Sequence, residues 1–277
     1  MLHFIFLFLA ALGTASAYLI ESSISFWWIP AFFVGGYVGI VLLYVIFLLI
    51  TSIFLPTKKP IEKPSAFCRF MIWITMDWVM ALLRIKIRVT GREKLPNEPC
   101  VLICNHQSDF DPMTVLAVLR ERKIAYISKE SNFKIPIVGR FIFHAGFLSI
   151  DRNNGVRALR TLHVAADRMK ETGVDIGIYP EGTRSRTGKL LRFKTGAYVL
   201  AKNADAPIVV MSTKGTDTVS KRTPFRKVRV ELEVLDVISK EEVRDLTADE
   251  LAAKSKEMIE ISLFGAVQST EDSKTEA

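Results

Sequence analysis

The sequence CVLICNHQSDFD, residues 100–111, joins a short apolar run to a polar segment that carries His106 and Asp111. Such an apolar run with polar residues after it is typical of a buried strand that ends in a loop. A second apolar run, residues 174–178, is followed by YPEGTRS, residues 179–185. We therefore expect two polar loops to share one edge of a sheet.

From about residue 86 the sequence alternates short apolar runs with longer amphipathic ones, which predicts an α/β domain. Strands are predicted at 85–89, 101–104, 124–128, 147–150, 175–179, 208–212 and 228–235. Helices are predicted at 112–122, 137–144, 155–171, 194–203 and 249–263. The expected fold is a mixed sheet flanked by helices over residues 86–265, and the polar tail, residues 266–277, is expected to be disordered.

The first 55 residues contain no lysine or arginine and one acidic residue, Glu21. Residues 2–20 and 26–55 are each apolar and long enough to cross a bilayer, which takes roughly 20 helical residues. This pattern predicts a transmembrane hairpin over residues 1–55. A signal peptide cleaved near residues 14–17 is the alternative, although it lacks a positive n-region.

The basic residues after the hairpin predict its orientation. Lys58, Lys59 and Lys63 follow the second apolar run, whereas the connection at residues 21–25 has no basic residue. The positive-inside rule therefore places the rest of the chain at the cytoplasmic face of the cell membrane.

Residues 56–85 are predicted to form a linker and an amphipathic helix. The apolar stretch 67–83 contains Trp73 and Trp78, and aromatic rings are favoured in the headgroup layer of a membrane. The alternative is a helix packed on the folded domain. The two interpretations are compatible.

The charge is concentrated beyond the apolar segment. All 37 basic residues and 28 of the 29 acidic ones lie there, giving a formal net charge of +9. This charge favours anionic lipid headgroups or phosphorylated metabolites as partners. Nucleic acid is not expected, since the sequence has no RNA-binding motif, zinc-finger spacing or basic repeat. The three cysteines form no CxxC pair, so we expect neither a disulfide framework nor a metal site.

The first polar loop holds a candidate acid–base pair. A histidine can take a proton from an alcohol that attacks a carbonyl, and a carboxylate can fix its tautomer. His106 and Asp111 could form such a pair if the intervening loop curls back. Alternatively, Asp111 caps a helix that has Pro112 at its first position, and His106 is an ordinary loop residue. For Asp109 we expect a solvated or capping side chain.

The second polar loop has the composition of an anion site. Glycine lets the backbone approach a ligand, and the planar fork of Arg184 matches phosphate oxygens. The alternative is a surface turn with an ion pair between Glu181 and Arg184. Lys129 and Arg152 follow two further predicted strands and strengthen the phosphate hypothesis, although each alone is typical of a surface charge.

These segments together resemble the glycerophospholipid acyltransferase family, and most closely the bacterial 1-acyl-sn-glycerol-3-phosphate acyltransferases. The resemblance covers roughly residues 70–240. It rests on motifs in a fixed order, namely Asn105 to Asp111, Lys129-Glu130 with Pro136 and Gly139, Gly146 to Arg152, Tyr179 to Ser185, and Ala206 to Val209. Val210 stands where the family commonly has a second proline.

The resemblance implies that residues 86–265 form an acyltransferase domain with His106 and Asp111 as the catalytic dyad. It further implies that the acceptor is held by Glu181, Gly182, Thr183 and Arg184 and its phosphate by Lys129 and Arg152. The expected reaction transfers an acyl group from acyl-CoA or acyl carrier protein to the sn-2 hydroxyl of lysophosphatidic acid, without a metal or another cofactor. Alternatives are glycerol 3-phosphate or another lysophospholipid as acceptor, or a non-catalytic membrane protein that binds anionic lipid.

Overall fold

The computed structural model describes residues 1–21, 25–57, 61, 63–185, 187–223 and 226–265. Within these residues the domain is built on one seven-stranded sheet in the order β1-β7-β6-β2-β5-β3-β4. The strands are β1 Ile85–Thr90, β2 Val101–Cys104, β3 Ile124–Lys129, β4 Leu148–Ile150, β5 Asp175–Ile178, β6 Ile208–Lys214 and β7 Val228–Ile238. Each predicted strand is confirmed.

The sheet is mixed, as predicted. Strands β6, β2, β5, β3 and β4 run parallel to one another, β7 is antiparallel to β6, and β1 is parallel to β7. The carboxyl ends of β2, β5, β3 and β4 therefore lie side by side at one edge. This edge carries all the loops singled out in the sequence.

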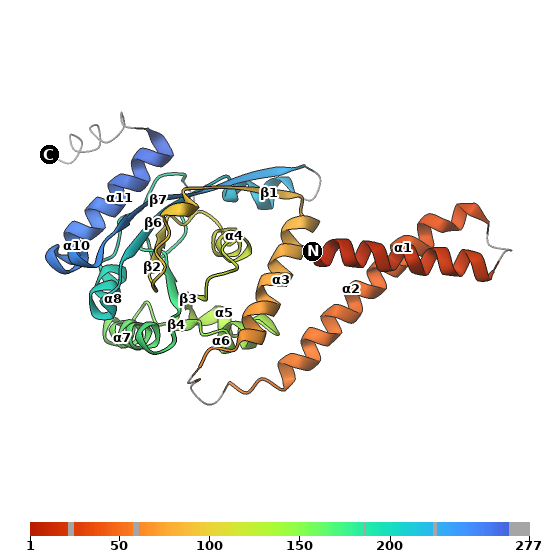
Figure 1. The fold of residues 1–277 in the computed structure, drawn as a ribbon, viewed down its shortest axis with the longest axis horizontal. Coiled ribbons are helices and arrows are strands. Elements are labelled where there is room, and N and C mark those ends of the chain that lie inside the picture. Colours follow the sequence, from red (N-terminus) through yellow and green to blue (C-terminus); the bar gives the residue numbers. More distant parts are fainter. Residues whose placement is uncertain (22–24, 58–60, 62, 186, 224–225, 266–277) are drawn as a thin grey trace.

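The predicted helices are also present, and they cover both faces of the sheet (Figure 1). One face carries α7 Gly155–Thr172, α8 Gly196–Ala204, α10 Lys240–Asp245 and α11 Ala248–Phe264; the other carries α3 Ala66–Leu82 and α4 Phe110–Val118. The remaining short helices are α5 Glu130–Phe133, α6 Val138–His144 and α9 Val219–Arg222, with 3₁₀ turns η1 Phe26–Trp28, η2 Arg92–Lys94 and η3 Thr216–Thr218. Of these short segments only α6 was predicted. Helix α10 was not predicted either.

Helix α4 is displaced relative to the predicted range of 112–122, since it begins at Phe110 and ends at Val118. The reason lies in Arg122, whose guanidinium donates through Nε to Asp175 Oδ2 at 2.5 Å and also binds the carbonyl oxygen of Pro96. Because the helix ends at Val118, the chain can turn and bring Arg122 to the buried carboxylate of Asp175 at the start of β5.

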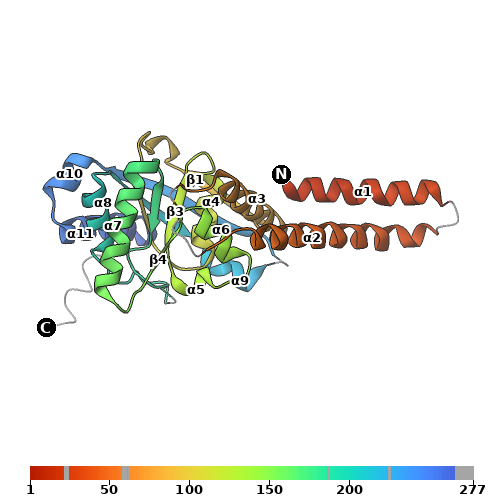
Figure 2. The ribbon, with the colours of Figure 1, turned by 90° about the horizontal axis from the view of Figure 1, so that it is seen from below.

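The apolar N-terminal residues form two helices, α1 Leu2–Ile20 and α2 Ile29–Ile53, that pack together and project from the domain (Figure 2). Both are long and apolar enough to cross a membrane by length and composition. Their outer surfaces expose large apolar side chains, among them Leu19 of α1 and Leu43 of α2, which are 82% and 67% exposed. Such exposure supports membrane association.

Helix α3 links this hairpin to the domain. Its inner face buries Met71, Ile74 and Trp78, while Phe67 and Phe70 stay exposed. Trp78 packs edge-on against Phe6 of α1, with ring centroids 6.0 Å apart. Helix α3 also contacts α4 and α6 of the domain, which agrees with the packed-helix interpretation, and Trp78 contacts the hairpin within the protein. Its placement in the headgroup layer stays a prediction. The predicted tail at 266–277, and Lys58 and Lys59 of the orientation argument, lie outside the described residues.

Candidate active site

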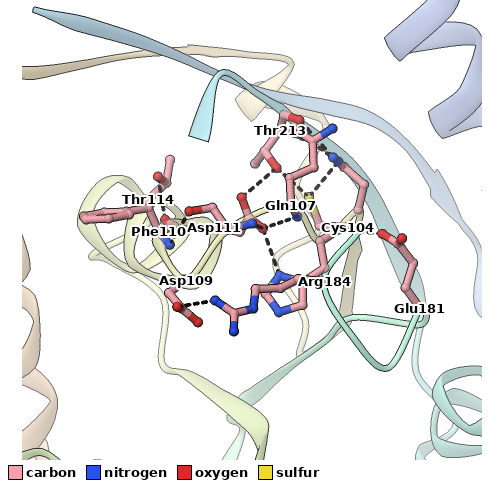
Figure 3. A network of polar contacts seen from close by, with 12 residues as sticks. Cys104, Gln107, Asp109, Phe110, Asp111, Thr114, Glu181, Arg184 and Thr213 are labelled. Atoms are coloured by element: carbon pink, nitrogen blue, oxygen red, sulfur yellow. Dashed lines mark hydrogen bonds and ion pairs between the residues drawn. The ribbon is translucent and has the colours of Figure 1, made fainter. Parts of the chain in front are cut away.

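His106 and Asp111 meet at the carboxyl end of β2. His106 Nδ1 lies 2.9 Å from Asp111 Oδ2, and the Asp111 side chain is fully buried while the His106 side chain is 14% exposed. The loop between them curls as expected, because the same Asp111 oxygen accepts the backbone N–H groups of Gln107 at 2.7 Å and Ser108 at 2.8 Å (Figure 3). A carboxylate with three donors fixes both the loop and the imidazole.

Helix capping by Asp111, the alternative interpretation, is not what the structure shows. Helix α4 begins at Phe110, and Asp111 and Pro112 both lie in its first turn. The amides bound by Asp111 belong to the preceding loop. Its second oxygen, Oδ1, lies 3.4 Å from Thr213 Oγ1 of β6.

Aromatic rings support the imidazole from the side of β5. The rings of His106 and Tyr179 stack with centroids 4.1 Å apart and planes 16° apart, and Tyr126 of β3 stacks on Tyr179 at 5.6 Å. Space for the Tyr126 ring depends on Gly177, where an added Cβ would lie 2.3 Å from it. The Tyr179 hydroxyl is buried without a hydrogen-bond partner in the described part of the chain. Burial raises the pKa of Tyr179, so this hydroxyl stays protonated.

Glu181 ties the second loop to the first. Its Oε1 accepts the backbone N–H of His106 at 2.6 Å, and its Oε2 accepts that of Leu191 at 3.0 Å. The Glu181 side chain is buried, and this burial raises the pKa of its carboxyl despite the two amide donors. Since both oxygens are occupied, Glu181 positions the loops. The contact of Glu181 with the acceptor stays a prediction.

Arg184 does not pair with Glu181. Its guanidinium instead forms an ion pair with Asp109, which was expected to be solvated or to cap a helix (Figure 3). Ser185 N–H donates to the carbonyl oxygen of His106 at 2.8 Å, so the two loops are joined again beside this pair. The structure thus brings the histidine loop and the arginine loop together.

A cavity of about 410 Å³ opens beside this ion pair. It is lined by Gln107, Ser108, Asp109, Phe110, Arg184, Ser185, Gly188, Asp217, Ser220 and Lys221. Arg184 and Lys221 are its basic residues. Asp109 and Asp217 are its acidic residues, so the lining carries two charges of each sign close to the His106 loop.

Gly182 and Thr183 form the turn between Glu181 and Arg184. Gly182 has a φ of +69°, and a Cβ at this position would meet Lys194 at 3.0 Å. This left-handed turn directs Glu181 inward and leaves Thr183 exposed. Thr183 is thus accessible to a ligand, while Gly182 shapes the backbone.

Lys129 is the last residue of β3, and Arg152 follows β4 at the same sheet edge. In the described chain neither side chain forms a hydrogen bond or ion pair, and neither lines the cavity beside Arg184. Partial burial lowers the pKa of Arg152. The structure brings these two cations to the correct edge but does not join them to Arg184, so their role stays a prediction.

The role of Asn105 in the site was not predicted from the sequence. Asn105 is fully buried, and its amide exchanges two hydrogen bonds with the backbone of Thr213, at 2.8 and 2.9 Å. It thereby extends the pairing of β2 with β6 by one residue. The signal available in the sequence was an asparagine directly after an apolar run. The pairing of β6 with β7 shifts its register between Val210 and Met211, at the position where the resembled family commonly has a second proline.

A second cavity, of about 970 Å³, lies between the end of α2 and the α5–α6 segment. Its walls are mostly apolar and include Ile53, Phe133 and Phe143, and Arg140 and Arg168 also line it. A mostly apolar cavity therefore lies at the base of the hairpin.

Comparison with known proteins agrees with this architecture. Residues 86–214 match the model of the family described as Acyltransferase. The chain is 35% identical over 158 residues to 1-acyl-sn-glycerol-3-phosphate acyltransferase beta of Homo sapiens, spanning 56% of each protein. It is 31% identical to the 1-acyl-sn-glycerol-3-phosphate acyltransferase of Haemophilus influenzae, over 64% of this chain and 75% of that one.

A solved structure is similar as well. The crystal structure of the 1-acyl-sn-glycerophosphate acyltransferase PlsC from Thermotoga maritima is 25% identical, with a TM-score of 0.60 over 80% of this chain and 87% of that one. The family match covers β2, β5 and the two loops that hold the His106 and Arg184 side chains. On the strength of these matches, this chain belongs to the acyltransferase family that includes the 1-acyl-sn-glycerol-3-phosphate acyltransferases.

Proposed function

We propose that this protein transfers an acyl group from acyl-CoA or acyl carrier protein to the sn-2 hydroxyl of 1-acyl-sn-glycerol 3-phosphate, which yields phosphatidic acid. The observation that carries the proposal is the contact between His106 Nδ1 and the buried Asp111 carboxylate. With Nδ1 occupied by Asp111, the other ring nitrogen, Nε2, is left to act on a substrate.

In the proposed reaction, His106 Nε2 takes the proton of the acceptor hydroxyl while its oxygen attacks the thioester carbonyl. The carbon–sulfur bond then breaks, and the leaving thiolate receives the proton from the imidazolium, which Asp111 steadies. The reaction as proposed uses no metal and no covalent enzyme intermediate. General base catalysis contributes about 10²- to 10⁴-fold, so positioning of the two substrates must supply much of the remaining acceleration.

The acceptor phosphate is proposed to bind Arg184, with Lys129 and Arg152 as further candidates and Thr183 as an exposed hydroxyl nearby. Lys221, which lines the cavity beside Arg184 together with Asp217, supplies a second cation there and supports this proposal. We propose that the α1–α2 hairpin holds the protein in the cell membrane, with the domain on the cytoplasmic side. Lysophosphatidic acid and phosphatidic acid would then enter and leave through the bilayer.

The test uses the purified full-length chain in detergent with an acceptor panel and both thioester donors. The panel contains lysophosphatidic acid, glycerol 3-phosphate and other lysophospholipids. We expect phosphatidic acid from lysophosphatidic acid, and no product with His106→Ala. His163→Ala is the matched control, since His163 is an exposed histidine on α7 far from β2 in sequence. Full turnover by His106→Ala, or preference for another acceptor, would contradict the proposal.

A further inference from the structure

A strongly basic concavity lies outside the candidate active site. This cavity, of about 570 Å³, is lined by Lys86, Gly215, Thr218, Arg222, Lys227 and Arg229. We call it the basic hollow. Its four cationic side chains are exposed, and its lining contains no carboxylate. Within the described chain, none of the four forms a salt bridge or a side-chain hydrogen bond.

The backbone forces these like charges together. Strands β1 and β7 pair in parallel with Lys86 directly beside Arg229. Gly215 approaches β7 so closely that an added Cβ would lie 2.5 Å from the carbonyl oxygen of Arg229. Like charges on neighbouring strands destabilise a sheet, and a bound anion removes that cost.

The hollow is attached to the base of the hairpin. Beneath it, Val219 of α9 packs in one buried cluster with Met80 of α3 and with Ile85, Val228 and Val230. One turn earlier in α3, Asp77 binds the terminal amine of Met1 at 2.6 Å, where α1 starts.

The figures show the same placement. Strand β1 begins beside the C-terminal end of α3 and the N-terminus (Figure 1), and α9 lies on the side from which the hairpin projects (Figure 2). A hairpin embedded in a bilayer would therefore bring the hollow close to the membrane surface.

We propose that the basic hollow binds the phosphate groups of anionic phospholipids in the membrane that holds the α1–α2 hairpin. Each basic residue near an anionic membrane surface strengthens binding about fivefold, so four together form a substantial electrostatic contact. A soluble phosphate compound, such as the coenzyme of a thioester donor, has matching charge. The position at the hairpin base favours the lipid.

Headgroup binding would also orient the candidate active site. In the short helix α9, Ser220 and Lys221 line the cavity beside Arg184, whereas Arg222 lines the hollow. Lipid contacts at Arg222 would hold α9, and with it one wall of that cavity, at the membrane surface. The inference concerns docking and does not depend on the acyl-transfer proposal.

Chemical labelling of lysines tests the inference in the full-length protein. The protein is placed in lipid nanodiscs of phosphatidylcholine, with or without phosphatidylglycerol, and treated with an amine-reactive reagent. We expect Lys86 and Lys227 to react several-fold more slowly when phosphatidylglycerol is present, and high salt to reverse this protection. Lys170, an exposed residue of α7, serves as the internal reference and should not change.

A variant pair gives the matched control. Arg222→Gln with Arg229→Gln should abolish most of the protection at Lys86 and Lys227, whereas Arg157→Gln with Arg160→Gln on α7 should leave it intact. Equal labelling in the two kinds of nanodisc would overturn the inference. Protection by coenzyme A or inorganic phosphate in phosphatidylcholine alone, with none from phosphatidylglycerol, would overturn it too, because the site would then serve a soluble anion.

Discussion

The carboxylate of Asp109 holds the guanidinium of Arg184 in an ion pair between two loops that lie 75 residues apart in the sequence. Asp109 is 77% exposed and Arg184 is 35% exposed, so the pair is open to solvent and to ligands. An acceptor phosphate that binds Arg184 must compete with this carboxylate.

Asp109→Asn is predicted to lower the KM for lysophosphatidic acid without changing kcat. Exposed ion pairs contribute about 0.2–1 kcal/mol, so removing the competing carboxylate should lower KM by up to about fivefold. Arg184→Ala should raise KM. Steady-state kinetics in mixed micelles measure both. If Arg184→Ala leaves KM unchanged, Arg184 does not bind the phosphate. If Arg184→Ala raises KM but Asp109→Asn has no effect, Asp109 does not compete with the phosphate for Arg184.

Asp111→Asn is predicted to lower kcat by about 10²- to 10⁴-fold, the range set by the general base that Asp111 orients. The asparagine oxygen can still accept the amides of Gln107 and Ser108, so the loop should keep its path while the charge beside His106 is lost. Thermal unfolding checks that the variant is folded. A kcat close to that of the wild type would show that the contact between His106 and Asp111 has no catalytic role.

The strands could be predicted because runs such as residues 101–104 and 208–212 are apolar, and the sheet topology then placed their loops together. The ion-pair partner of Arg184 could not be predicted from the sequence. A pairing with Glu181 three residues away is the local choice, but the left-handed turn at Gly182 sends Glu181 inward to the His106 amide. Whether Glu181 is buried depends on the tertiary structure, and the spacing of Glu181 and Arg184 in the sequence does not show it.

Helix α10 was missed for another reason. Its sequence, KEEVRD, has no apolar periodicity and buries Val243. A signal was available nonetheless, since Ser239 caps this helix by accepting the amide of Glu242. Thr247 and Glu250 form a complete capping box at the start of α11. Capping residues identify such short helices better than hydrophobicity does.

Glu181→Gln is predicted to destabilise the protein by about 1–3 kcal/mol. The side-chain NH₂ group of glutamine is a donor, and it would face a backbone N–H that a carboxylate oxygen accepts in the wild type. The amide that loses its acceptor belongs to His106 or to Leu191. Either loss loosens the joint between the two loops, so kcat should fall as well. Denaturant unfolding and steady-state kinetics measure the two effects.

The stability difference should also depend on pH. Burial raises the pKa of Glu181 above its ordinary value. Such a group stabilises the fold fully below its unfolded-state pKa, and this contribution is lost as the pH rises through its folded-state pKa. The advantage of wild type over Glu181→Gln should therefore be larger near about pH 4 than near about pH 7. The opposite trend would show that the two amide donors outweigh burial.

Tyr179 offers a test of the ring stack with two matched substitutions. Tyr179→Phe keeps the ring against His106 and removes a buried hydroxyl that has no partner in the described chain, so stability should stay equal or rise. Tyr179→Leu removes the stack, which is worth about 0.5–1.5 kcal/mol, and kcat should fall by about two- to tenfold as the imidazole loses its support. Thermal unfolding and kcat are measured for both. If Tyr179→Phe lowers kcat as much as Tyr179→Leu does, the hydroxyl group accounts for the role of Tyr179, and ring stacking does not.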